Sequence, residues 1–219
     1  MGKKALIVGI NYIGTPSELH GCISDAQRIK HLLINNLGFK DEDIIYVTDD
    51  QTDIKFKPTK NNIVKYFNKL IVNAKLGDVL FFTYSGHGSQ ILDISGDEDE
   101  RKDEVLVPLD YKLNGLIVDD WIQSMVQLLP KGVKLFSLLD SCNSGSAFDL
   151  KYIVKETKPP TSNVYTYSFT ESKKYAITKA DVCMLSGCRD DQYSVDTVVN
   201  NIPTGALTQA FITVLSNSN

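Results

Sequence analysis

The chain has 219 residues, of which 42% are hydrophobic and 23% are charged, with a formal net charge of −4. These values are typical of one folded domain with a sizeable core. The net negative charge favours neither nucleic acid nor an anionic membrane as a partner, and no apolar run is long enough to span a bilayer. We therefore expect a monomeric globular protein with neither kind of partner.

The four cysteines show neither a CxxC pair nor the spacing of a zinc site. No signal-peptide pattern stands at the start of the sequence. Because disulfides persist mainly in oxidising compartments, we expect reduced thiols and a cytoplasmic protein.

Apolar segments of strand length alternate with longer amphipathic segments through most of the chain. Buried strands are predicted at residues 4–10, 44–47, 78–84, 134–139 and 181–186. Helices are predicted at residues 22–37, 59–74, 119–128 and 205–214. Short antiparallel strands are expected at residues 104–108 and 116–118, around a turn at Asn114-Gly115. This alternation predicts an α/β fold with a mostly parallel central sheet and helices on both faces.

Two segments lack this periodicity. Residues 94–103 are strongly charged without matching the spacing of an EF-hand, which indicates a solvated surface loop. Residues 148–179 are rich in Lys, Thr, Ser and Tyr and contain the pair Pro159-Pro160. Such a composition indicates a mobile connection with some local structure. No internal repeat or second domain is predicted.

Cys142 follows the predicted strand at residues 134–139, where the sequence changes abruptly to small polar residues. In open α/β sheets the catalytic groups lie just beyond the carboxyl ends of the strands. A nucleophile is therefore expected at this position. Free cysteine is also among the residue types most often buried for packing alone, so Cys142 by itself leaves both interpretations open.

His87 lies between Gly86 and Gly88, directly after the predicted strand at residues 78–84. Flanking glycines leave room around the imidazole and allow the backbone to approach a ligand closely. A thiol and a base at the ends of two strands of one sheet are the pair that nucleophilic catalysis requires. The sequence therefore predicts Cys142 as the nucleophile and His87 as its base.

Both strand ends carry motifs that resemble those of a known peptidase family. Residues 84–90 (Tyr-Ser-Gly-His-Gly-Ser-Gln) and 139–145 (Leu-Asp-Ser-Cys-Asn-Ser-Gly) are similar to the two catalytic motifs of metacaspases, the caspase-fold cysteine peptidases. The similarity extends, in the expected order, to residues 19–26, 103–110 and 184–192. It covers nearly the whole chain, and the combination of motifs is highly specific.

The resemblance implies the caspase-hemoglobinase fold in a single peptidase domain at residues 1–219. Residues 1–150 would form a large-subunit-like region, residues 151–179 a connection, and residues 180–219 a small-subunit-like region. Metacaspase domains continue past the helix predicted at residues 205–214 to another helix and a closing strand. The last region is therefore expected to be cut short.

The resemblance also implies a site for peptide-bond hydrolysis through a thioester. The oxyanion hole is expected at the backbone N–H groups of Gly88 and Cys142. The pocket for the substrate residue before the cut is assigned to Cys22, Asp25, Ser85 and Asp140. Two carboxylates in this pocket predict protein or peptide substrates with Arg or Lys at that residue. The same pair argues against a separase-like or legumain-like peptidase.

Calcium is the cofactor that the resemblance implies, as an activator. Its expected ligands are Asp103, Asp119, Asp120 and Asp149, with Asp99 as the alternative to Asp103. Carboxylates of this number, with backbone carbonyls and waters, suffice for the roughly 6–8 oxygen ligands of Ca²⁺. Without the resemblance, adjacent carboxylates at a helix start are equally well explained as capping residues.

The predicted connection is rich in lysine, which is a side chain that the acidic pocket is expected to accept. Exposed loops are preferred sites of proteolysis. We therefore expect self-cleavage in this segment, first at Lys173 and Lys174.

Asn143 departs from the family pattern, because metacaspases usually carry His directly after the catalytic Cys. Together with the shortened last region, it leaves a second interpretation open: a caspase-fold regulatory or aggregate-binding module with weak or no proteolysis. The presence of both His87 and Cys142 favours the active peptidase.

Overall fold

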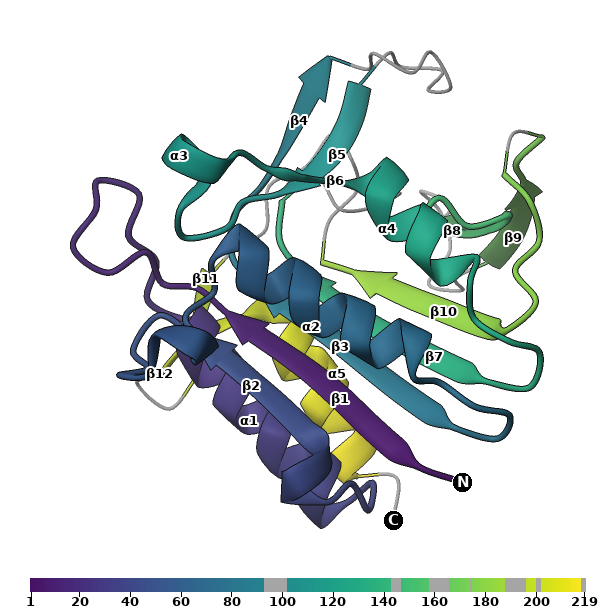
Figure 1. Cartoon of the computed structure of the whole chain (residues 1–219), viewed down its shortest axis with the longest axis horizontal. Coiled ribbons are helices and arrows are strands. Elements are labelled where there is room, and N and C mark those ends of the chain that lie inside the picture. Colours follow the sequence, from purple (N-terminus) through teal and green to yellow (C-terminus); the bar gives the residue numbers. More distant parts are fainter. Residues whose placement is uncertain are drawn as a thin grey trace.

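The computed structural model describes residues 1–92, 102–142, 147–157, 166–173, 175–187, 196–199 and 202–217. Its centre is a five-stranded parallel sheet in the order β10-β7-β3-β1-β2 (Figure 1). The strands are β1 (Lys3–Gly9), β2 (Ile44–Thr48), β3 (Val79–Ser85), β7 (Lys134–Asp140) and β10 (Asp181–Ser186). All five coincide with strands predicted from apolar runs, so the predicted α/β class with a parallel sheet is confirmed.

Helices cover both faces of this sheet, as the alternation of elements predicts. The helices are α1 (Cys22–Asn35), α2 (Lys60–Val72), α4 (Asp119–Val126) and α5 (Ala206–Ser216). Side chains of α1 and α5 pack on one face, and those of α2 and α4 pack on the other. In Figure 1, α2 lies in front of the sheet and α5 behind it.

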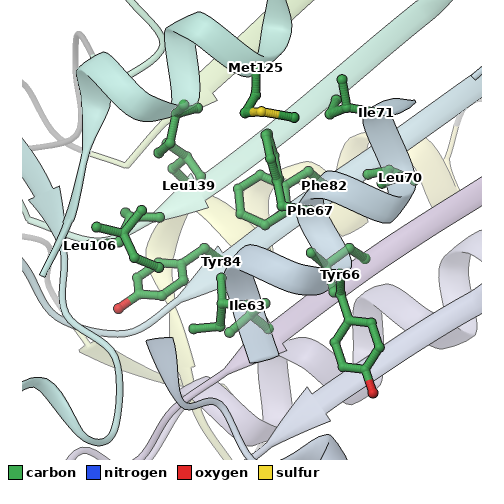
Figure 2. Close-up of a cluster of buried hydrophobic side chains, with 14 of the residues drawn as sticks. Ile63, Tyr66, Phe67, Leu70, Ile71, Phe82, Tyr84, Leu106, Met125 and Leu139 are labelled. Carbon is green, nitrogen blue, oxygen red and sulfur yellow. The ribbon is translucent and has the colours of Figure 1, made fainter. Parts of the chain in front are cut away.

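The two faces are separated by the alternation of side chains along each strand. In β1, Ala5 and Ile7 contact the α1 side, whereas Leu6 and Val8 belong to the cluster on the α2 side. The cluster on the α2 side is rich in aromatic rings. Phe67 of α2 meets Phe82 of β3 edge to face, with ring centroids 5.0 Å apart, and Figure 2 shows this pair beside Met125 and Leu139. Packing on both faces therefore holds the strands that lead to the site.

Smaller antiparallel sheets lie around the central one in the described part of the chain. Their strands are β4 (Gly88–Leu92), β5 (Lys102–Leu106) and β6 (Ile117–Val118) in one sheet, β8 (Tyr152–Thr157) with β9 (Thr166–Glu171), and β11 (Asp196–Val199) with β12 (Ile202–Gly205). The remaining elements are the 3₁₀ turns η1 (Asp41–Asp43) and η2 (Ile54–Phe56) and the one-turn helix α3 (Tyr111–Asn114).

The structure corrects two details of the prediction and shows the local structure of a third segment. β5 and β6 do pair, but Asn114-Gly115 is not a tight turn between them, because α3 occupies the connection. The expected connection at residues 148–179 contains the β8–β9 hairpin, whose second strand is exposed along its whole length and so shows no buried alternation. Of the charged loop, residues 93–101 lie outside the described residues, and Asp103 belongs to β5 rather than to a loop.

The register of the central sheet aligns the ends of its inner strands. Gly9 at the end of β1 pairs with Ser85, and Ser85 pairs with Asp140 at the end of β7. The loops after β3 and β7 therefore leave the sheet side by side. This is the carboxyl edge, where α/β proteins place their chemistry.

Candidate active site

His87 and Cys142 stand at equivalent places beyond the aligned ends of β3 and β7, since Ser85 pairs with Asp140. The backbone N–H of Gly86 continues this contact by donating to the carbonyl oxygen of Asp140, 3.5 Å away. Both His87 and Cys142 are partly exposed, as groups that meet a substrate must be. The fold thus brings the thiol and the imidazole predicted from the sequence to one edge of the sheet.

Gly88 brings the two loops into direct contact. A methyl group on its Cα would lie 2.0 Å from the carbonyl oxygen of Cys142. No side chain fits in that space, which gives a steric reason for glycine after His87. The two backbone segments predicted to supply the oxyanion hole are therefore adjacent.

The imidazole of His87 is oriented by a backbone carbonyl that was not predicted. Its Nε2 lies 2.8 Å from the carbonyl oxygen of Ser17, in the loop between β1 and α1. A carbonyl oxygen only accepts, so Nε2 carries the hydrogen and the neutral ring presents the lone pair of Nδ1. The ring therefore has a defined tautomer, with Nδ1 as the basic nitrogen. No residue-type pattern signals a contact made by a main-chain oxygen.

Asp25 and Asp140, the two predicted pocket carboxylates, are buried and hold the C-terminal part of the chain. Asp25 accepts hydrogen bonds from the Thr204 hydroxyl and, at 2.8 Å, from the Gly205 N–H. One oxygen of Asp140 accepts from the Thr208 N–H at 2.9 Å and from its hydroxyl at 2.8 Å. The acids thus dock β12 and the first turn of α5 against the strand ends. This contact joins residues far apart in the chain, so no local pattern predicts it.

The two acids also act on each other. Burial raises the pKa of Asp25 to about 7, and the charge of the neighbouring Asp140 adds to the rise. Arg28 opposes it from one turn further along α1, with its Nη1 atom 4.0 Å from the Asp25 carboxylate. The same guanidinium group donates to the Thr204 hydroxyl at 2.7 Å and to Gln209. The guanidinium group of Arg28 is therefore a cation of the chain itself that lies beside Asp25.

The other two predicted pocket residues lie around this pair. Ser85 is buried at the end of β3, next to Asp140 across the ladder. Cys22 is buried at the first residue of α1, where its N–H donates to the Asn11 side chain at 3.0 Å. All four predicted pocket residues therefore stand at the carboxyl edge of the sheet or on the helix that begins there.

A second group of acids lies at the start of α4. Asp119, Asp120 and Asp149 each place one carboxylate oxygen within 4.8 Å of the others. Asp149 is buried and has a φ of 46°, in the left-handed region that is uncommon for residues other than glycine. Burial, the charge of Asp149 and a contact with Glu104 raise the pKa of Asp119 to about 9. Oxygen donors that repel one another in this way fit a hard divalent cation such as Ca²⁺.

Asp103, the fourth predicted ligand, is buried in β5. It pairs with Ile91 in the β4–β5 ladder. The next residue of β5, Glu104, contacts the group, because its N–H donates to Asp119 at 2.8 Å. Glu104 was not selected from the sequence, because a single acid in a short strand carries no ligand signal.

Lys173, one of the two expected self-cleavage positions, is exposed just after the β8–β9 hairpin. The backbone before it is tied down, since the Ser172 N–H donates to the Lys151 carbonyl at 2.8 Å. Lys174, Asp99 and Asn143 lie outside the described residues.

Comparisons with known proteins identify the family. Residues 3–151 match the family model described as metacaspase, peptidase C14 domain. The chain is 38% identical to Metacaspase-1A of Neurospora crassa over 97% of this chain and 56% of that protein. It is 36% identical to Metacaspase-1 of Schizosaccharomyces pombe over 99% of this chain and 60% of the other. A crystal structure of protein GSU0716 from Geobacter sulfurreducens shares the fold, with a TM-score of 0.69 and 23% identity over 99% of this chain and 83% of that one.

The matched residues form a cysteine-peptidase domain, and the chain belongs to the metacaspase family. The caspase-like fold expected from the motifs is thereby confirmed. The chain spans 56% and 60% of the two curated relatives named above. None of the helices in the described ranges is long and apolar enough to cross a membrane.

Proposed function

We propose that this chain is a calcium-activated cysteine endopeptidase that cleaves peptide bonds after Arg or Lys. The observation that carries the proposal is the meeting of the His87 and Cys142 loops, where Gly88 leaves no room for a side chain against the Cys142 carbonyl. Membership of the metacaspase family supports the class of reaction. The calcium dependence and the substrate preference rest on the two acidic groups.

The geometry supports a two-residue mechanism. Nδ1 of His87 takes the proton of the Cys142 thiol, and the thiolate attacks the carbonyl carbon of the substrate. The backbone N–H groups of Gly88 and Cys142 would stabilise the oxyanion. His87 then returns the proton to the leaving amine as the C–N bond breaks, and water hydrolyses the thioester. The Ser17 carbonyl keeps the ring in the tautomer that this sequence of proton transfers requires.

The acidic pair supports a cationic substrate residue. Asp25 and Asp140 bring two carboxylates to the strand end that carries the nucleophile, and Arg28 shows that a guanidinium group is accommodated beside Asp25. A substrate Arg or Lys would find the same charge complementarity. Calcium, when bound by Asp119, Asp120 and Asp149 together with Asp103 of β5, would neutralise their mutual repulsion and hold the start of α4 to the segment after the nucleophile loop.

The proposal predicts that calcium-stimulated hydrolysis depends on the acidic group at α4. Fluorogenic peptides ending in Arg, Lys, Asp or Asn are incubated with calcium and with chelator. We expect Arg and Lys peptides alone to be cut, and calcium stimulation to be lost in Asp119→Ala/Asp120→Ala while Cys142 remains alkylatable. The matched control is Glu42→Ala/Asp43→Ala, which removes two exposed acids from η1. Full hydrolysis in excess chelator would contradict the calcium proposal, and no hydrolysis of any peptide would favour the binding-module interpretation.

Self-processing is the second prediction of the proposal. Wild-type protein incubated with calcium should be cut after Lys173 or Lys174, because Lys173 is exposed and the proposed pocket accepts lysine. Intact-mass spectrometry of wild type beside Cys142→Ala measures the cut and shows whether it is the chain's own. A Lys173→Gln/Lys174→Gln variant should stay whole while retaining peptide hydrolysis. Wild-type chains that remain intact while they hydrolyse peptides would contradict the prediction.

A further inference from the structure

Two buried tyrosines meet directly behind His87. Tyr12 follows β1 in the chain and Tyr84 lies in β3, and their hydroxyl oxygens are 3.2 Å apart. Both rings are almost completely inaccessible to solvent. Figure 2 shows the Tyr84 ring beside Leu106, with its hydroxyl pointing out of the apolar cluster. A buried hydroxyl needs partners, and these two find them on the backbone of His87 and Val107.

The hydroxyl pair contacts both backbone polar groups of His87. The His87 N–H donates to the Tyr12 oxygen at 2.9 Å, and the Tyr84 hydroxyl donates to the His87 carbonyl at 2.8 Å. On the other side, the Tyr12 hydroxyl donates to the Val107 carbonyl at 2.6 Å, and the Val107 N–H donates to the Tyr84 oxygen at 3.1 Å. Each hydroxyl hydrogen is used once in this assignment, and the Val107 N–H also donates to the His87 carbonyl at 3.2 Å, so the two tyrosines link the backbones of His87 and Val107.

Burial keeps both hydroxyls in their donating form. It raises the pKa of Tyr12 and of Tyr84 well above the usual tyrosine range, so neither loses its proton at physiological pH. The network therefore stays intact across the pH range in which a Cys–His pair works.

The backbone around the tyrosines is shaped for this contact. Tyr12 has a φ of 54°, a left-handed conformation that is costly for an aromatic residue. At Gly86, a methyl group would lie 2.9 Å from the Tyr84 hydroxyl and 3.1 Å from that of Tyr12. The glycine before His87 thus makes room for the hydroxyl pair, as Gly88 makes room for the Cys142 backbone.

Tyr12 also contacts the imidazole itself. Its ring centroid lies 4.7 Å from that of His87, with the planes tilted by 39°. The loop that carries Tyr12 also carries Ser17, whose carbonyl faces Nε2. One loop therefore contacts His87 at its backbone N–H, at its ring and at its Nε2 atom.

We propose that Tyr12 is a positioning residue for catalysis, which holds His87 in register with Cys142 through the hydroxyl network it shares with Tyr84. In a catalytic triad an acidic third residue orients the histidine through its ring. Here the hydroxyl network would orient the histidine through its backbone. The proposal builds on the peptidase function above. It gives the loop after β1 a role in catalysis, although that role rests on a tyrosine hydroxyl and not on a charged side chain.

The test is Tyr12→Phe, which keeps the ring and removes one hydroxyl. We expect kcat on Arg peptides to fall about 10- to 100-fold, the scale of a small misplacement of a catalytic group, with KM nearly unchanged. Tyr84→Phe should behave in the same way. The matched control is Tyr66→Phe, which removes a partly buried hydroxyl whose partner is the Lys55 carbonyl at 3.0 Å, away from the site. If Tyr12→Phe and Tyr66→Phe have equal thermal stability but only Tyr12→Phe has a lower kcat, the loss of activity comes from positioning and not from folding.

A second readout is independent of any substrate. Iodoacetamide alkylation of Cys142 is followed against pH in wild type, His87→Ala, Tyr12→Phe and Tyr66→Phe. We expect the pH profile of Tyr12→Phe to move from that of wild type toward that of His87→Ala, and Tyr66→Phe to match wild type. A Tyr12→Phe profile and kcat equal to wild type would overturn the proposal, as would a wild-type profile that does not depend on His87. Peptides left uncut alongside the expected alkylation profiles would refute the proposed peptidase function and leave the positioning role standing.

Discussion

Cys142→Ala should abolish peptide hydrolysis, by at least about 10⁴-fold, and His87→Ala should come close to the same loss. The thiol and the base act as a unit, because removing either leaves the other without a partner in the bond-making step. The two losses should therefore not add in the double variant. Turnover is measured on Arg and Lys peptides in the presence of calcium, and folding is checked by thermal unfolding.

The chain provides its own control for this experiment. Cys183 is an exposed free cysteine on β10, at the edge of the same sheet. Cys183→Ala should keep wild-type turnover, which shows that the loss in Cys142→Ala is not a general effect of removing a thiol. Wild-type hydrolysis by Cys142→Ala would show that the proposed nucleophile is wrong.

The part of this site that rests on strand ends was predictable from the sequence. Runs such as residues 79–85 and 134–140 are apolar because both faces of a parallel sheet are buried, and this makes each strand visible in the sequence. Where such a run ends, the next polar residues must lie at the carboxyl edge. Cys142 and His87 follow two such runs, so their meeting required only that β3 and β7 be neighbours.

The groups that orient these residues were not predictable in the same way. Ser17 acts through its carbonyl, which every residue type possesses, and Tyr12 acts from a loop with no periodicity. Thr204 and Thr208 contact Asp25 and Asp140 across 179 and 68 residues of chain. Contacts of this kind depend on the tertiary structure, which brings together residues that are distant in the sequence. The β8–β9 hairpin was missed for the opposite reason, since an exposed strand such as β9 has no buried face to produce a pattern.

Replacing either acid of the predicted pocket should weaken selection for cationic substrates strongly. Asp140→Asn and Asp25→Asn should each lower kcat/KM for Arg and Lys peptides, with a scale of about 2–5 kcal/mol for removing one member of a buried charge pair. Both acids also dock α5, so loss of activity alone does not separate the two roles. Thr208→Val is the matched control, because it removes a hydroxyl that donates to Asp140 and leaves the carboxylate charge in place.

If the carboxylates bind substrate, the Asn variants lose activity far beyond any change that Thr208→Val causes, while all three share a modest loss of thermal stability. If the acids only dock α5, the loss of activity in all three variants follows their loss of stability. A preference for Asp peptides, or unchanged kcat/KM in both Asn variants, would rule the pocket out.

The pH dependence of Asp25 provides an independent check, because its direction is opposite to that of an ordinary paired acid. Its folded-state pKa is about 7, above the value of about 3.9 expected in the unfolded chain, because burial disfavours the charge. Between these two values the folded state binds more protons, so the contribution of Asp25 to stability falls as pH rises from about 4 to about 7. Over the same range the carboxylate becomes available to a substrate cation.

Wild type should therefore lose stability relative to Asp25→Asn across this window, measured by thermal unfolding, while its kcat/KM for Arg peptides rises relative to that of the variant. A constant difference in both quantities from pH 4 to pH 8 would show that Asp25 does not titrate in this range as a buried acid would.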